Sequence, residues 1–161
     1  MTAVDVPVMA NGVPVTVGAS LPPYTLAAVR PENMKLWAGF LRDPNPIHLD
    51  AQAVRAKGLG NKVINQGPAN LAYLITMLQR AFPRAVLETL EVRYGGMVYG
   101  GDAVEATGTV RELSLGVCAS RVICDVSLRA DGRDGVIWGV AVLSLGHPTA
   151  AETRSAGSIL G

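Results

Sequence analysis

Three side chains that can exchange protons or hold water lie close together in the sequence: Asp43, Asn45 and His48. A carboxylate and an imidazole can each accept or donate a proton in a reaction. The amide of Asn45 offers a donor and an acceptor that can hold the water molecule involved, or the loop itself. The same residues also suit a structural turn, because Asp and Asn side chains bond to nearby backbone amides. Spacing alone therefore leaves a catalytic and a structural interpretation open.

A second feature with chemical potential is the step from Gly67 to Pro68, where an apolar helix is predicted to begin. The first amides of a helix have no partner within it, and they lie at the positive end of its dipole. The Gly67 amide is therefore a candidate to stabilise an oxyanion, an effect worth about 3–4 kcal/mol of barrier where enzymes use it. The alternative is an ordinary glycine at a helix start.

A predicted helix over 31–41 must position the acid and the histidine. Pro31 suits its first turn, apolar residues recur at spacings of three and four, and Arg42 stands at its end. Because Pro44 and Pro46 prevent the helix from continuing, residues 43–50 are expected to form a loop.

The remaining segments predict a sheet around the helix that begins at Gly67, which is apolar on most sides and belongs in the middle of a domain. A short helix is predicted over 51–57, with Asp50 as its N-cap. Strands are predicted over 13–17, 24–29, 88–97, 103–113, 117–130 and 135–145, with a bulge or bend at the glycines 95 and 96 and a tight connection at 131–132. The expected architecture is one long, mostly buried helix wrapped by an antiparallel sheet. Residues 1–147 form a single domain in this interpretation, and 148–161 a flexible tail.

Composition narrows the classes of partner. A net charge of +1, without a block of like charge, argues against nucleic acid or an anionic membrane as the main partner. Cys118 and Cys124 are too few for a zinc cluster, and we expect buried thiols, no metal and no cofactor. Neither a signal peptide nor an apolar stretch of transmembrane length is present, so we expect a soluble, cytoplasmic protein.

The segment D-P-N-P-I-H-L-D, followed by a glycine that opens an apolar helix, resembles the signature of the MaoC-like dehydratases, which include the R-specific enoyl-CoA hydratases of the hydratase 2 family. That signature reads, in effect, G-D-x-N-P-[LIV]-H, and later H-G-M. The resemblance covers roughly residues 24–145. It implies an α+β hot-dog fold, with an antiparallel β-sheet wrapped around a long central α-helix.

The resemblance also implies an activity, the reversible syn addition of water to a trans-2-enoyl thioester to give the R-3-hydroxyacyl product. By position, Asp43 and His48 match the catalytic dyad, Asn45 the motif amide and Gly67 the oxyanion amide. The implied substrate is an acyl-CoA or acyl-carrier thioester. The implied assembly is a dimer whose sheets join across the interface, with a homodimer expected and a heteromer as the alternative.

Three residues depart from the family pattern. Arg42 stands in place of the glycine before the aspartate, Gln66 in place of the histidine before the oxyanion glycine, and Pro68 in place of the methionine after it. Arg42 could reach a phosphate or carboxylate of a ligand, and Pro68 removes one backbone donor from the helix start. We expect these three residues to influence which substrate binds.

Other functions stay open at this point. The chain could be the dehydratase subunit of a heteromeric or carrier-protein-linked system, or a non-catalytic hot-dog partner. A thioesterase of the same fold is disfavoured, because such thioesterases do not need the acid-to-histidine loop.

Overall fold

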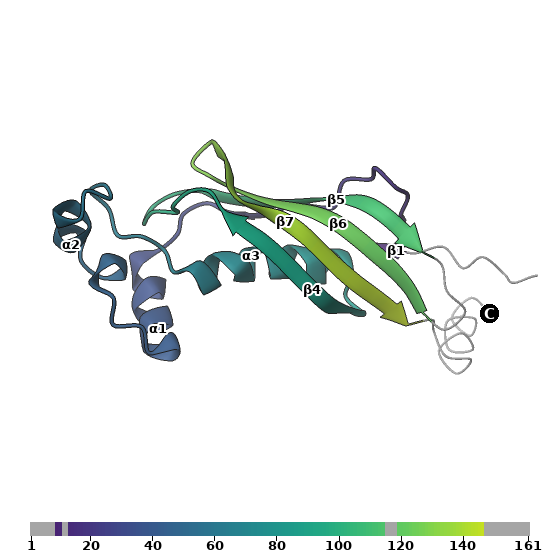
Figure 1. Cartoon of the computed structure of the whole chain (residues 1–161), viewed down its shortest axis with the longest axis horizontal. Coiled ribbons are helices and arrows are strands. Elements are labelled where there is room, and N and C mark those ends of the chain that lie inside the picture. The colour runs from purple at the N-terminus through teal and green to yellow at the C-terminus, as the bar shows by residue number, and fades with distance from the viewer. Residues whose placement is uncertain (1–8, 11–12, 115–118, 147–161) are drawn as a thin grey trace, which may run out of the picture.

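The computed structural model of the chain describes residues 9–10, 13–114 and 119–146. Its main sheet has five antiparallel strands in the order β3-β5-β6-β7-β4, and β1 and β2 form a separate two-stranded ribbon. The strands are β1 (Met9–Ala10), β2 (Val13–Pro14), β3 (Tyr24–Leu26), β4 (Ala85–Tyr94), β5 (Val104–Ser114), β6 (Ala119–Ala130) and β7 (Arg133–Gly146). The sheet curves over one long helix, α3, as predicted (Figure 1).

The helices begin and end where proline and capping residues predict. They are α1 (Pro31–Leu41), the 3-10 turn η1 (Pro46–His48), α2 (Ala51–Ala56) and α3 (Gly67–Ala81). Asp50 caps α2, because its Oδ1 accepts a hydrogen bond from the Gln52 amide at 2.7 Å. The predicted 43–50 loop contains η1, which starts at Pro46 after the N-cap residue Asn45. Helices α1 and α2 lie at one end of the sheet, beyond the start of α3 (Figure 1).

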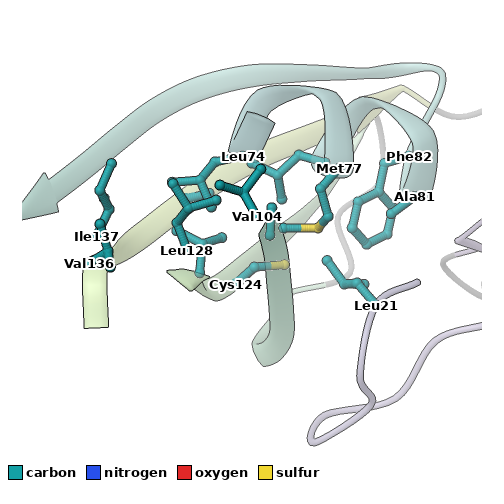
Figure 2. Packing of buried hydrophobic residues seen from close by; sticks show 14 of the residues in the cluster. Leu21, Leu74, Met77, Ala81, Phe82, Val104, Cys124, Leu128, Val136 and Ile137 are labelled. Atoms are coloured by element: carbon teal, nitrogen blue, oxygen red, sulfur yellow. The ribbon is translucent and has the colours of Figure 1, made fainter. Parts of the chain in front are cut away.

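The hydrophobic core lies between α3 and the sheet. Figure 2 shows Leu74 and Met77 of the helix directed toward Val104, Cys124 and Leu128 of the strands, all of them buried. Burying an aliphatic side chain of this size stabilises a fold by about 1.5–3 kcal/mol. This packing fixes α3 beneath the sheet, and it thereby fixes the position of the helix start at Gly67.

The strands differ from prediction mainly at their ends. Strand β4 begins three residues earlier than predicted and ends at Tyr94, so the two glycines that follow it form a bend, while the register shift lies between Leu87 and Thr89. A Cβ atom on Gly95 would lie 2.3 Å from the Trp138 ring, so the close approach of β7 requires glycine there. The ribbon strand and β3 are both shorter than predicted.

The connection between β6 and β7 is the predicted tight turn. Asp131 and Gly132 both have positive φ, 50° and 75°, as in a two-residue hairpin loop that matches the twist of the strands. Cys124 is buried as expected, whereas Cys118 and the expected tail lie outside the described residues. No helix among the described residues is long and apolar enough to span a membrane.

Candidate active site

The C-terminus of α1 aims the chain toward the acid. Arg42 follows the helix in the left-handed region, with φ 51° and ψ 42°. Its amide donates to the carbonyl of Gly39 at 3.3 Å, and the Asp43 amide donates to the carbonyl of Ala38 at 2.9 Å. Left-handed residues end many helices in this way. The turn brings the Asp43 side chain out of the helix and toward η1.

Asn45 holds the loop in shape. Its amide donates to Oδ1 of Asp43 at 3.1 Å, and its own Oδ1 accepts from the Ile47 amide at 3.4 Å, at the N-terminus of η1. One carboxylate oxygen of Asp43 is thus occupied by the backbone, and the other remains for a second partner.

That second partner is His48, a buried residue that is 9% exposed. Its Nε2 lies 3.3 Å from Oδ2 of Asp43, and its Nδ1 lies 2.6 Å from the carbonyl oxygen of Ile64. A carbonyl can only accept, so Nδ1 carries a hydrogen and donates it. Nε2 is therefore the ring nitrogen that can exchange a proton beside Asp43.

The carbonyl that orients His48 belongs to a well-anchored loop. The Ile64 amide donates to the carbonyl of Ile47 at 2.9 Å, and Ile64 also forms a β-bridge with Tyr99. The Tyr99 amide donates to the carboxylate of buried Asp102 at 2.9 Å, and Arg133 of β7 pairs with that carboxylate. The role of the Ile64 carbonyl in orienting His48 was not predicted, because every residue has a backbone carbonyl and no sequence pattern marks this one.

Gly67 is the first residue of α3, three residues after Ile64. The N-cap residue Gln66 makes no side-chain cap bond to the helix, so the first amides of α3 have no helical partner and no side-chain cap. The hydroxyl of Tyr94 donates to the Gly67 carbonyl at 3.4 Å, and partial burial raises the pKa of that hydroxyl. The start of α3 thus lies on the same short segment that orients the histidine.

The other two residues around Gly67 have different environments. The side chain of Gln66 is fully buried, and its Nε2 donates to the carbonyl of Met34 at 2.9 Å. Gln66 therefore joins α1 to α3 instead of presenting its amide to the surface. Pro68 is exposed in the first turn of α3.

A buried polar cluster lies directly beside this segment and was missed from the sequence. Asn65 donates through Nδ2 to Oδ1 of Asn70 at 2.6 Å and to the hydroxyl of Tyr73 at 3.4 Å. Burial raises the pKa of Tyr73, and the hydrogen bond from Asn65 opposes that effect. Asn65 and Asn70 are each 4% exposed, so their mutual bond satisfies groups that would otherwise be buried unpaired. Asn70 faces inward at a helical position where an apolar residue is the usual expectation.

Comparisons with known proteins identify the family and the fold of the chain. A family described as the MaoC like domain has a sequence model that matches residues 4–125. No curated protein matches the chain.

Solved structures resemble the fold at low sequence identity. The chain is similar to the ChsH1–ChsH2 complex from Mycobacterium tuberculosis, with TM-score 0.70, 22% identity and coverage of 81% of this chain and 98% of that one. The R-hydratase PhaJ1 from Pseudomonas aeruginosa is similar with TM-score 0.69 and 22% identity, and the match covers 85% of this chain and 89% of that one. The (R)-hydratase from A. caviae involved in PHA biosynthesis is similar with TM-score 0.72 and 19% identity, and the match covers 81% of this chain and 97% of that one. The strand order and these likenesses confirm the predicted α+β hot-dog fold.

Proposed function

Because the chain belongs to the MaoC-like domain family, we propose that it is a hydratase of trans-2-enoyl thioesters, producing R-3-hydroxyacyl thioesters reversibly. The observation that carries this proposal is the 3.3 Å contact between Nε2 of His48 and Oδ2 of Asp43. Both side chains have a backbone partner that holds them in place, the Ile64 carbonyl for the ring and the Asn45 amide for the carboxylate. A pre-positioned acid and imidazole are the parts that water addition needs.

In the hydration direction, the dyad removes a proton from water while the water oxygen bonds to C3 of the enoyl group. The π electrons of the C2–C3 bond move toward the thioester, whose carbonyl oxygen gains negative charge as an enolate. The dyad then delivers one proton to C2, so that one water molecule has been added and Asp43 and His48 return to their starting state. Dehydration follows the same steps in reverse.

The enolate oxygen needs a hydrogen-bond donor, and the Gly67 amide is our assignment for that role. Support comes from its position at the start of α3, where the helix dipole is positive, and from the following Pro68, which has no amide hydrogen. A single preorganised donor of this kind contributes about 3–4 kcal/mol to barrier lowering. Gln66, buried behind it, positions the segment by its bond to Met34.

We assign Arg42 and Pro68 to the substrate-facing surface, since both are exposed next to proposed catalytic groups. Arg42 adjoins Asp43, and Pro68 adjoins Gly67. Gln66, in contrast, acts indirectly on substrate choice, because no part of its side chain is exposed.

The assembly we propose is a homodimer formed through β4. This strand of 10 residues pairs with β7 on one side only within the described chain, so its other edge offers unpaired backbone groups. Val86 and Tyr94 on this strand are 66% and 52% exposed. Pairing with a second copy would cover them.

Light scattering on the purified chain should give twice the mass of the chain. A monomeric chain that becomes active only with a different hot-dog protein would replace the homodimer by a heteromer.

Hydration of crotonyl-CoA tests the activity, followed as loss of enoyl-thioester absorbance with identification of the R-3-hydroxy product. Asp43→Asn and His48→Gln should each lower kcat/KM by about 10²–10⁴-fold. Asp50→Asn is the matched acid-to-amide control, because Asp50 caps α2 and asparagine caps equally well.

Wild-type-like rates in both dyad variants would overturn the assignment. The same reactions, assayed for free thiol, distinguish a thioesterase, which would release coenzyme A where a hydratase does not.

A further inference from the structure

Two buried asparagines connect the segment before α3 to the helix itself. Asn65 immediately precedes the N-cap residue Gln66, and Asn70 is the fourth residue of α3. Nδ2 of Asn65 donates to Oδ1 of Asn70 at 2.6 Å, and each of the two residues is 4% exposed. Residues at these two positions often form an apolar contact, the hydrophobic staple, which sets the angle at which the chain enters a helix. Here a hydrogen bond between two amides takes the place of that contact.

An amide pair is a costly choice at these positions. Burying an amide costs free energy that a hydrogen bond only offsets, whereas an apolar pair would stabilise the fold by its burial. Asparagine is also a poor helix former, because its side chain competes for backbone hydrogen bonds. Ala69 and Leu74 on the same helix are buried and apolar, so the surroundings suit an apolar staple. Local choices that reduce stability are expected where residues serve function.

Asn65 shares a peptide group with the carbonyl that orients the histidine. The Ile64 carbonyl lies 2.6 Å from Nδ1 of His48 and accepts its hydrogen. The Asn65 amide, which belongs to the same planar peptide, donates to the Val98 carbonyl at 2.7 Å. The side-chain bond anchors Asn65 to α3 as well. The direction of the Ile64 carbonyl therefore depends on two anchors at Asn65, one through the backbone and one through the side chain.

Asn70 completes a set of hydrogen bonds around the start of α3. Its amide donates to the carbonyl of Gln66 at 3.1 Å, while its side chain accepts from Asn65. Gly67, whose amide is assigned to the oxyanion, lies between these contact points along the chain. A hydrogen bond has a preferred length and direction, whereas apolar side chains can slide past one another. The amide pair therefore restricts the entry angle of the chain more tightly than an apolar staple would.

We propose that Asn65 and Asn70 are positioning residues of the active site, which fix the Ile64 carbonyl and the Gly67 amide relative to each other. Asn65 acts through the Ile64 carbonyl on the ring of His48. Asn70 acts through the first turn of α3 on the Gly67 amide. Neither asparagine needs to touch the substrate. The part that concerns Gly67 rests on the proposed hydratase function, whereas the part that concerns His48 can be measured without turnover.

Three variants separate positioning from a contribution to folding. Asn70→Leu should lower the melting temperature by about 4–8 °C, because it leaves the buried amide of Asn65 without this acceptor. The double variant Asn65→Leu with Asn70→Leu should recover most of that loss, since it restores an apolar staple. Asn70→Asp keeps an acceptor for Asn65, and a negative charge near a helix start is favourable.

Thr76→Val is the matched control on the same helix. The Thr76 hydroxyl donates to the carbonyl of Ala72 at 2.7 Å, so this variant removes a side-chain hydrogen bond of α3 that does not involve the segment before the helix. We expect the control to match the wild type in each measurement of the active site.

Nitrogen-15 NMR of labelled histidine tests the effect on His48 directly. At a pH where the ring is neutral, the wild type, Asn70→Asp and Thr76→Val should show the proton on Nδ1 alone. The double leucine variant should lose this single tautomer and show both ring forms. The chain has two histidines, and His48→Gln identifies which signals belong to His48. A folded double variant that keeps the single Nδ1–H tautomer would overturn the proposal.

Kinetics with crotonyl-CoA test the consequence for the reaction. In the double leucine variant kcat should fall about 10–100-fold while KM changes less than about twofold, because displacement of catalytic groups affects the transition state most. Asn70→Asp should retain kcat within about threefold, since its acceptor preserves the bond. Wild-type kcat in a folded double variant would overturn the proposal.

The two readouts distinguish this inference from the proposed function. If the wild type hydrates no enoyl thioester but the His48 tautomer still depends on the asparagine pair, the hydratase function is rejected and the positioning of His48 is supported. If the wild type is active and neither the tautomer nor kcat depends on the pair, only the positioning role is rejected.

Discussion

Nε2 of His48 lies 3.3 Å from Oδ2 of Asp43 in a ring orientation that the protein sets from the other side, through the 2.6 Å bond from Nδ1 to the Ile64 carbonyl. The carbonyl keeps one tautomer of the neutral ring and turns Nε2 toward the acid. A five-residue separation in sequence thus becomes a direct contact, and this contact depends on a loop that comes 16 residues after the histidine.

The dyad should behave as one unit. We expect the double variant Asp43→Asn with His48→Gln to lose no more than about a factor of ten beyond the worse single variant, because each residue needs the other for proton transfer. Rates of crotonyl-CoA hydration for the three variants measure this. A loss of rate in the double variant equal to the product of the two single losses would indicate that the two side chains act in independent steps.

The buried carboxylate of Asp102 should need its partner on β7. Arg133→Ala should lower the free energy of unfolding by about 1–3 kcal/mol, because it removes one hydrogen-bond partner from a carboxylate that is 2% exposed, while Lys62 still lies 3.9 Å away. Urea unfolding measures the effect. Since Asp102 also holds the Tyr99 amide next to Ile64, we expect kcat to fall in the same variant.

Arg129→Ala is the control for that experiment. Arg129 pairs with Glu105 and Asp134 on the surface, where ion pairs contribute less than about 1 kcal/mol. Equal destabilisation by the two substitutions would show that burial of Asp102 is not the cause.

The register of β4 on β7 should depend on the absence of a side chain at Gly139. A Cβ atom there would lie 1.9 Å from the Glu91 carbonyl oxygen. Gly139→Ala should therefore destabilise the fold by about 2–4 kcal/mol, since backbone and not a flexible side chain must move. Gly146→Ala on the same strand is the control, because its Cβ would meet nothing within 4 Å. Thermal unfolding that does not separate the two variants would contradict the expected clash.

Cys124 should make stability fall in alkaline solution. Burial raises the pKa of its thiol to about 12 in the folded protein, whereas an unfolded chain has a pKa of about 8.5. Below pH 8.5 both states keep the proton. Above it the unfolded state loses the proton first, so the free energy of unfolding drops by about 1.4 kcal/mol per pH unit until pH approaches 12.

Urea unfolding between pH 8 and pH 10 measures this decline. In Cys124→Ala the free energy of unfolding should fall less steeply with rising pH. Parallel slopes for the two proteins would show that other groups account for the pH dependence.

The helices could be predicted from the sequence because their signals are local. Pro31, Asp50 and Pro68 mark helix starts through their own backbone geometry or capping bonds, and the apolar spacing that follows needs no knowledge of distant residues. The hairpin at Asp131 could be predicted for the same reason, because the Asp131-Gly132 pair is itself a turn signal. The acid and the histidine could be named for a similar reason, since their motif is contained in six consecutive residues.

The tertiary structure decided what those residues contact. Ile64 orients His48 with a backbone carbonyl, a group that every residue has, so no pattern in the sequence could identify it. The side-chain direction of Gln66 depends on the position of α1 relative to α3, which is set by packing across the core. Arg42 could be recognised as an unusual residue beside the acid, but only the folded helix end revealed its left-handed backbone. Local propensities thus determine the elements and the reactive residue types, and long-range packing determines which atoms meet.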